Sequence, residues 1–177
     1  MKYLLSLGSN TGDPMANLKT AVGKLEEKSI FIEDWSSVYA TSPVDYVYQN
    51  DFLNMSLIVE TPHGPQQLLN KLKEIEHEMG RVKTIKKGPR NIDVDIIFWD
   101  NGSFESSDLT IPHKEAEKRL FVIFPTLEII GSSSCFEEEK SRLAHILETG
   151  QDRFVGQKIE KLCPFKIEGE DYGWENR

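Results

Sequence analysis

The chain has 177 residues, and its 21 lysines and arginines against 29 aspartates and glutamates give a formal net charge of −8. This length fits one domain, or one domain with a tail, and a content of 38% hydrophobic and 28% charged residues excludes a fibre or a disordered chain. The acidic balance argues against a general affinity for nucleic acid, because proteins of that class carry a basic surface that displaces phosphate counterions.

The first half of the chain predicts a strand, a helix and two further strands. Residues 2–7 form a short apolar strand candidate that breaks at Gly8, too early for a secretory signal or a membrane span. Asp13 and Pro14 are typical of a helix start, and apolar residues at helical spacing extend this helix to about residue 28. Strands are expected at residues 30–39 and 52–60. In the second of these, Phe52, Asn54 and Ser56 alternate with Leu53, Met55, Leu57 and Val59.

The next segment predicts a second helix and a strand. Gly64 and Pro65 open the helix, and Gly80 is placed to end it. The strand covers residues 92–99, with Asp93, Asp95 and Ile97 expected on one face and Ile92, Val94, Ile96 and Phe98 on the other. Two β-α-β units with short connections favour an α+β fold in which helices pack on a sheet.

Beyond residue 99 the pattern weakens. We expect a short extended stretch at residues 109–113, a helix from Lys114, an apolar run at residues 121–130 and a helix around residues 143–147. We therefore divide the chain into a core domain, residues 1–135, and a C-terminal extension, residues 136–177, with a helix and an acidic, mobile tail. Cys135 and Cys163 lack Cys-x-x-Cys spacing, so we expect no disulfide framework or zinc site and a reducing, cytoplasmic location.

Asp93 and Asp95 are the strongest chemical signal. Residues i and i+2 of a strand project side by side, with Cα atoms about 7 Å apart, so two carboxylates can chelate one Mg²⁺ or bridge two. A solvated strand face is the alternative. The segment from Arg81 to Arg90 contains five cations and no acid, and cations beside paired carboxylates suit a metal–nucleotide site. A solvated basic loop is the alternative there.

Phe52 and Asn54 share a strand face, so a flat heterocycle could stack on the ring while the amide reads its edge. The alternative is that Phe52 belongs to the core and Asn54 is a polar group at a sheet edge. His113 has no histidine partner at metal spacing, and a lone histidine is more often structural than catalytic. The sequence contains no Walker phosphate loop and no Ser-His-Asp signature, so covalent catalysis is not the first interpretation.

Six segments together resemble one known family. They are Leu7-Gly8-Ser9-Asn10, Thr41-Ser42-Pro43, Asp51-Phe52-Leu53-Asn54, Gly80-Arg81, Gly88-Pro89-Arg90-Asn91-Ile92-Asp93-Val94-Asp95-Ile96 and Leu109-Thr110-Ile111-Pro112-His113. These motifs and their order resemble those of the 6-hydroxymethyl-7,8-dihydropterin pyrophosphokinases of folate biosynthesis. The resemblance extends from Tyr3 to Ile130. The resemblance implies transfer of a pyrophosphoryl group from ATP to the pterin hydroxymethyl oxygen, with release of AMP and two Mg²⁺ ions. It also implies a ferredoxin-like β-α-β-β-α-β core with a mainly antiparallel sheet.

The resemblance assigns roles to individual residues. Asp93 and Asp95 would bind both metal ions and, with Arg81 and Arg90, would form the catalytic set. The pterin would contact Thr41, Pro43, Val44, Phe52, Asn54 and Phe121, and the two phenylalanines would sandwich it. The nucleotide would contact Glu76, Lys83, Ile96, Thr110, His113, Lys114 and Arg119. Residues 41–51 and 81–91 are long connections and are candidate lids that exclude water.

Four positions depart from the family pattern. Lys87 stands at a frequent tryptophan position, Lys83 and Asp108 at arginine positions, and Lys114 at a tyrosine position. We expect these changes to alter ATP affinity or lid dynamics and to leave the chemistry intact. No residue is an unambiguous general base; Asp95 and a metal-activated oxygen both stay open.

Two other functional classes use parts of the same residue set. A two-metal nucleotide phosphohydrolase would need the aspartates and arginines without an aromatic clamp, and a non-catalytic pterin-binding module would need the clamp without magnesium. The expected partners are ATP and the reduced hydroxymethylpterin, with no nucleic acid and no membrane, and the expected state is a monomer or weak dimer.

Overall fold

The computed structural model describes residues 1–44, 47–81 and 88–166. Its strands are β1 (Lys2–Ser9), β2 (Phe31–Trp35), β3 (Val38–Thr41), β4 (Phe52–Glu60), β5 (Asp93–Trp99), β6 (Phe104–Glu105), β7 (Thr110–Ile111) and β8 (Ile159–Cys163). Its α-helices are α1 (Pro14–Glu27), α2 (Pro65–Glu78), α3 (Leu120–Ile129) and α4 (Glu137–Thr149). Short 3₁₀ turns cover Ala116–Lys118, Ile130–Ser132, Ser134–Phe136 and Gln151–Phe154.

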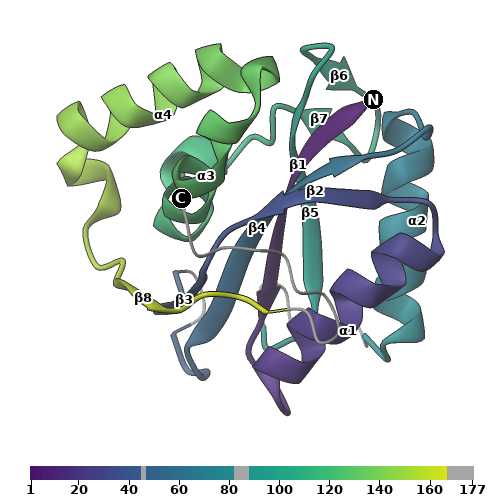
Figure 1. The fold of residues 1–177 in the computed structure, drawn as a ribbon. Coiled ribbons are helices and arrows are strands. Elements are labelled where there is room, and N and C mark those ends of the chain that lie inside the picture. Colours follow the sequence, from purple (N-terminus) through teal and green to yellow (C-terminus); the bar gives the residue numbers. More distant parts are fainter. Residues whose placement is uncertain (45–46, 82–87, 167–177) are drawn as a thin grey trace.

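The main sheet is antiparallel, with the strand order β5-β1-β4-β3-β8, and β2 pairs with β4 beside β3 (Figure 1). β1 and β4 are central and carry eight cross-strand partners from Lys2↔Glu60 to Ser9↔Leu53. This arrangement confirms the predicted α+β, ferredoxin-like core. β6 and β7 form a separate two-stranded sheet.

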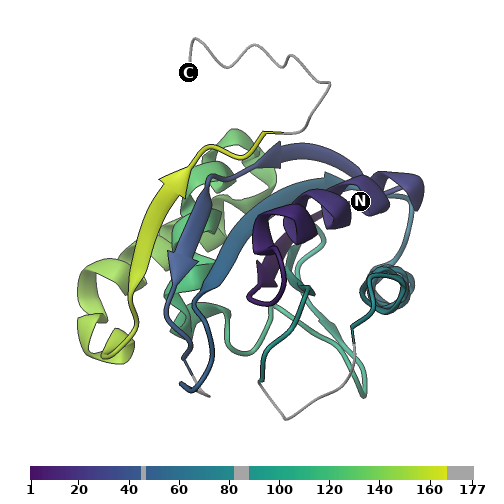
Figure 2. The same ribbon diagram turned by 90° about the horizontal axis from the view of Figure 1, so that it is seen from below.

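Helices cover both faces of the sheet, with α1 and α2 on one face and α3 and α4 on the other (Figures 1 and 2). The alternation along β4 explains this arrangement: Met55, Leu57 and Val59 pack in the cluster with α1 and α2, whereas Ile58 packs in the cluster with α3 and α4. The strand thus needs an apolar partner on each side. No helix within the described ranges combines the length and the apolarity that crossing a bilayer requires.

Three local predictions were wrong. The single strand expected at residues 30–39 is two strands, because Ser36 and Ser37 interrupt it: Ser36 Oγ donates to the carbonyl of Ser37 and accepts the backbone N–H of Ser56. Phe98 does not share a face with Val94, since the register against β1 shifts between Leu4 and Leu5 and places Phe98 in the other cluster. The helix expected from Lys114 is a 3₁₀ turn at Ala116–Lys118 before α3.

The chain after residue 136 adds more to the fold than the expected helix. α4 contributes Leu143 and Ile146 to the cluster under α3, and β8 pairs with the outer edge of β3, which the sequence did not predict. Beyond β8, the carbonyl of Phe165 accepts a hydrogen bond from Trp35 Nε1. The acidic tail predicted to be mobile lies outside the described residues.

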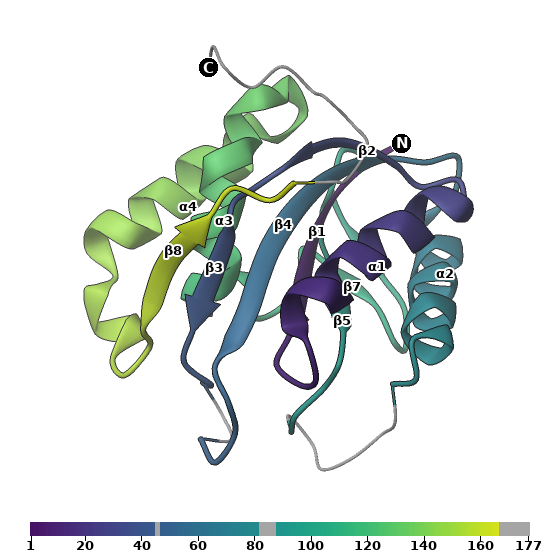
Figure 3. The ribbon, with the colours of Figure 1, turned by 60° about the horizontal axis from the view of Figure 1, so that its bottom comes forward.

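The end of the sheet at which β4 begins carries the candidate site. The connections after β1 and after β3, and the residues just before β5, emerge there together (Figure 3). At the opposite end, the amino group of Met1 donates to the carbonyl of Thr61, directly after β4.

Candidate active site

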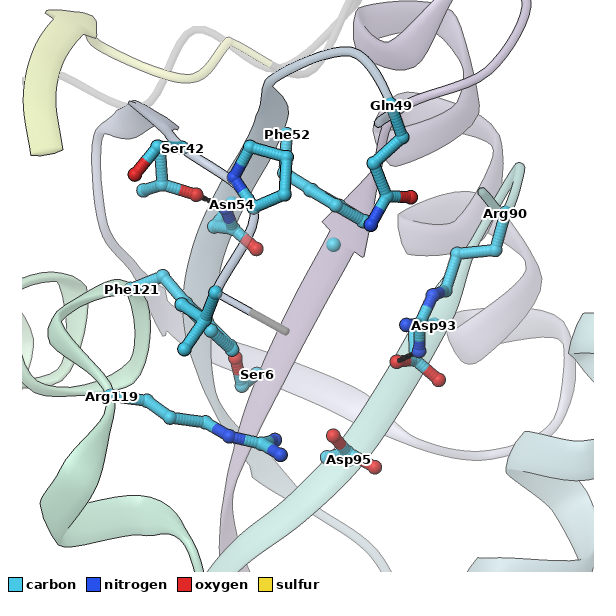
Figure 4. A pocket seen from close by; sticks show the side chains of 14 residues that line it. Ser6, Ser42, Gln49, Phe52, Asn54, Arg90, Asp93, Asp95, Arg119 and Phe121 are labelled. Atoms are coloured by element: carbon cyan, nitrogen blue, oxygen red, sulfur yellow. Dashed lines mark hydrogen bonds and ion pairs between the residues drawn. The ribbon is translucent and has the colours of Figure 1, made fainter. Parts of the chain in front are cut away.

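Asp93 and Asp95 lie on β5 opposite two small residues of β1. The register pairs Gly8 with Asp93 and Ser6 with Asp95, and all four residues line one cavity. Because glycine and serine are small, the neighbouring strand does not cover the carboxylates. The alternation predicted from the sequence thus places both acids beside an open space at the sheet surface (Figure 4).

Two arginines contact Asp93. Arg81 Nη1 lies 2.7 Å from Asp93 Oδ1, and Arg90 Nη1 contacts Asp93 Oδ2. Arg81 also pairs with Glu76 of α2, whose carboxylate accepts the backbone N–H of Val94 at 2.9 Å. Burial raises the pKa of the Glu76 carboxyl, and the charge of Arg81 opposes this change. Glu76 therefore ties α2 to β5 and helps to hold Arg81 beside the aspartates.

Among the described residues, no cation pairs with Asp95 as the two arginines pair with Asp93. Burial, together with the neighbouring charge of Asp93, raises the pKa of its carboxyl to about 7, and the charge of Arg119 partly opposes this increase. Within the described residues no ion pair reaches Asp95, although Figure 4 shows the guanidinium of Arg119 pointing towards it. A carboxylate that is buried beside a second carboxylate is stabilised by an added cation. These oxygen ligands therefore fit Mg²⁺, and since no cluster of three or more ligating side chains occurs in the described ranges, other ligands would come from water or substrate.

The cavity that contains Asp93 and Asp95 is also lined by aromatic side chains and an amide. Phe52 and Phe121 both line it, together with Thr41, Pro43 and Val44. Asn54 is buried, and its Nδ2 donates to Thr41 Oγ1 at 2.7 Å. Its Oδ1 lies above Gly8, so the amide is oriented by both neighbours.

Each phenylalanine also has an arginine over its ring. The guanidinium carbon of Arg90 lies 5.7 Å from the centre of the Phe52 ring, and that of Arg119 lies 5.5 Å from the centre of the Phe121 ring. Cations at this range are attracted by the negative face of the ring. The aromatic part and the charged part of the cavity are therefore adjacent.

A second cavity adjoins the first and shares Asp95 and Arg119 with it. Its lining includes five of the residues predicted to contact a nucleotide: Ile96, Thr110, His113, Lys114 and Arg119. Asp95 thus lies where the two cavities meet.

His113 is held by backbone contacts in this second cavity. Its N–H donates to the carbonyl of Ile97, and its Nδ1 accepts the N–H of Glu115 at 3.2 Å. Burial lowers the pKa of the His113 imidazole, and the charge of Arg119 lowers it further. The ring is therefore neutral at pH 7 and carries its proton on Nε2, which makes Nε2 a hydrogen-bond donor.

The remaining predicted residues lie elsewhere. Arg81 and Glu76 line neither cavity, although Arg81 pairs with both Glu76 and Asp93. Lys83 and Lys87 lie outside the described residues. Sequence reasoning missed Ser6, Gly8, Ser42 and Gln49, which line the first cavity. For Ser6 and Gly8 a signal existed, because they interrupt the apolar pattern at alternate positions of β1 beside the predicted aspartates.

Comparisons with known proteins identify relatives of this chain. The family model described as 7,8-dihydro-6-hydroxymethylpterin-pyrophosphokinase matches residues 4–131. The chain is 37% identical over 149 residues to the 2-amino-4-hydroxy-6-hydroxymethyldihydropteridine pyrophosphokinase of Bacillus subtilis, covering 84% of this chain and 85% of that protein. It is 39% identical over 166 residues to the bifunctional protein FolKE of Lactococcus lactis subsp. cremoris, covering 93% of this chain and 47% of that one.

The chain thus spans less than half the length of the bifunctional Lactococcus relative. Among solved structures, it resembles a Plasmodium falciparum HPPK-DHPS with a TM-score of 0.60 at 15% identity, over 89% of this chain and 46% of that one. At this identity the structural similarity supports the fold alone.

Proposed function

The chain belongs to the 7,8-dihydro-6-hydroxymethylpterin-pyrophosphokinase family, and from this membership we propose that it pyrophosphorylates 6-hydroxymethyl-7,8-dihydropterin in folate biosynthesis. In this reaction the hydroxymethyl oxygen attacks the β-phosphorus of ATP. The bond from that phosphorus to the α–β bridging oxygen breaks, AMP leaves with the oxygen, and the hydroxyl proton is released. The observation that carries the proposal is that Asp95 and Arg119 belong to both cavities.

The first cavity suits a reduced pterin. Phe52 and Phe121 offer ring faces for a flat heterocycle, and ring stacking and burial both favour such binding. Asn54 presents Oδ1 to this space while its Nδ2 is bonded to Thr41, so the amide can accept from a donor on the heterocycle edge. A pterin held there would direct its hydroxymethyl group towards Asp95.

The second cavity suits the nucleotide. Lys114 and Arg119 supply positive charge, and the neutral His113 offers a donor at Nε2. Arg81 and Arg90 add positive charge beside Asp93. A polyphosphate that extends from the second cavity towards the aspartates would therefore meet cations on both sides of them. Ile96 and Thr110 line the same cavity without adding charge.

Asp93 and Asp95 would hold two Mg²⁺ ions with ATP. When bound, these ions neutralise phosphate oxygens and lower the barrier to attack on phosphorus. The chain's own residues position the reactants: the aromatic cavity fixes the acceptor, the arginines orient the phosphates, and the shared wall aligns the two for in-line displacement. Arg90 pairs with Asp93 and also lies over Phe52, so it connects the phosphate and pterin regions.

Other parts of the proposal concern the whole protein. We expect a monomer or weak dimer in the cytoplasm that acts on small molecules and binds no nucleic acid. We also expect residues 1–135 to form the pyrophosphokinase core and residues 136–177 to form its extension.

The test is to mix the protein with ATP, Mg²⁺ and the reduced hydroxymethylpterin and to identify the nucleotide product. AMP whose formation depends on the pterin supports the proposal. ADP formed without pterin would instead identify a phosphohydrolase, and pterin binding without nucleotide turnover would identify a binding module.

A further inference from the structure

Asn10 joins two substrate-facing segments at the end of β1. It is 2% exposed and follows Ser9 directly. Its Nδ2 donates to Gln49 Oε1 at 3.0 Å and to the carbonyl of Asn50 at 3.1 Å. Its Oδ1 accepts the N–H of Arg90 at 2.9 Å, and its own backbone N–H donates to the carbonyl of Arg90 at 3.1 Å. The amide therefore bonds to one segment through nitrogen and to the other through oxygen.

The two bonded segments carry different parts of the proposed site. Gln49 lines the aromatic cavity, and Asn50 lies two residues before Phe52. On the other side, Arg90 lines the same cavity, pairs with Asp93 and lies over the Phe52 ring. Asn10 itself does not line either cavity, so it acts on a substrate only through these residues.

The geometry points to Asn10 as a positioning residue that fixes the pterin wall relative to Arg90, so that each substrate helps to order the contacts of the other. This inference rests on the proposed function. The buried side-chain amide makes three of these bonds, and the backbone N–H of Asn10 makes the fourth. The amide holds one arrangement of both segments, because moving either segment leaves a buried donor or acceptor unpaired. Ordering one segment by ligand binding then lowers the entropy cost of ordering the other.

Nearby Asn17 provides a matched control. Its Nδ2 donates to Ser9 Oγ at 3.1 Å and to the carbonyl of Thr11 at 2.9 Å, so it stabilises the same β1–α1 connection. These bonds stay within residues 9–17 and do not reach Gln49, Asn50 or Arg90. Replacing Asn17 thus removes a hydrogen-bonded amide from the same connection without cutting the proposed link.

The experiment measures pterin affinity by fluorescence with and without Mg²⁺ and a non-hydrolysable ATP analogue. In the wild type, the analogue should tighten pterin binding, within the roughly 5- to 150-fold range of typical site coupling. Asn10→Ala should reduce this enhancement at least fivefold, while the affinity for the analogue alone changes less than threefold. Asn17→Ala should keep the full enhancement even if its melting temperature falls.

Asn10→Asp tests the same link with less disturbance. The carboxylate keeps an acceptor for Arg90 N–H but presents oxygen to Gln49 Oε1 and the Asn50 carbonyl, so it should also lose the enhancement. If neither Asn10 variant folds, hydrogen exchange on the wild type replaces them: pterin alone should slow exchange of the Arg90 N–H.

Equal enhancement in the wild type and both Asn10 variants, no enhancement in the wild type, or unchanged exchange at Arg90 would overturn the inference. A wild type that binds neither pterin nor nucleotide would instead contradict the proposed function, so the two failures are distinguishable.

Discussion

Asn54 Oδ1 lies so close to Gly8 that a Cβ built on residue 8 would be 2.8 Å from it. The glycine therefore permits the orientation in which Asn54 Nδ2 bonds to Thr41 and Oδ1 faces the cavity. This relationship crosses the two central strands, since Gly8 and Asn54 are direct partners in the β1–β4 register.

Gly8→Ala should weaken pterin binding. The added methyl must displace the Asn54 amide, and overpacking of this kind costs about 1–3 kcal/mol, or roughly five- to 150-fold in the dissociation constant. Fluorescence titration with the pterin measures the change. Gly23→Ala is the control, because nothing lies within 4 Å of its added Cβ and alanine favours the α1 helix. Equal pterin affinity in the wild type and Gly8→Ala would contradict the assigned role of Asn54.

Phe52→Ala should also weaken pterin binding, by about tenfold, because it removes a stacking face and the ring beneath Arg90. Phe31→Ala is a matched control, since Phe31 is 57% exposed on β2 and does not line the cavity. Isothermal titration calorimetry with the pterin distinguishes the two variants. A loss of the same size in both would show that the effect does not come from stacking.

Asp95→Asn should slow pyrophosphoryl transfer by roughly a hundredfold or more, since it removes charge from the point at which the cavities meet. Pterin affinity should change less than twofold, because the aromatic cavity keeps its walls. Single-turnover AMP formation and pterin titration give the two readouts. Asp152→Asn, at an exposed position, is the control. Wild-type turnover by Asp95→Asn would refute the metal assignment.

Stability should depend on pH through His113. The pKa of its imidazole is lowered in the folded state by burial and by Arg119, from an ordinary value of about 6.5. As the pH falls below that value, His113 is protonated in the unfolded chain before it is protonated in the folded protein. Acidification therefore favours unfolding. Urea unfolding between pH 7.5 and 5.5 should therefore show a steeper loss of stability in the wild type than in His113→Gln. Identical slopes would mean that His113 titrates alike in both states.

Strong alternation and helix boundaries made much of the fold predictable. The strand Phe52–Glu60 was predicted with its observed bounds, because a period of two over nine residues admits one assignment. The register shift at Leu4 was not predictable, since it depends on how β1 and β5 meet and not on either strand alone. β8 was missed because Glu160 and Lys161 break its apolar character, and its pairing with β3 joins residues distant in the sequence.

Part of the candidate site was also predictable from the sequence, and part depends on tertiary packing. Asp93, Asp95, Phe52 and Asn54 follow from spacing within single strands. The position of Arg119 beside Asp95 depends on where α3 begins after the 3₁₀ turn, and the bonds of Asn10 depend on two connections that meet only in the folded chain. Local patterns thus identify side chains, and tertiary packing decides which of them share a cavity.

The bond from Met1 to Thr61 and the bond from Trp35 to Phe165 anchor both ends of the described chain away from the strand ends that carry the cavity. An affinity tag or a second enzyme joined at Met1 would therefore extend from the opposite side of the molecule. Immobilising the protein through Met1 on a sensor surface should therefore leave the cavity accessible and preserve ligand binding.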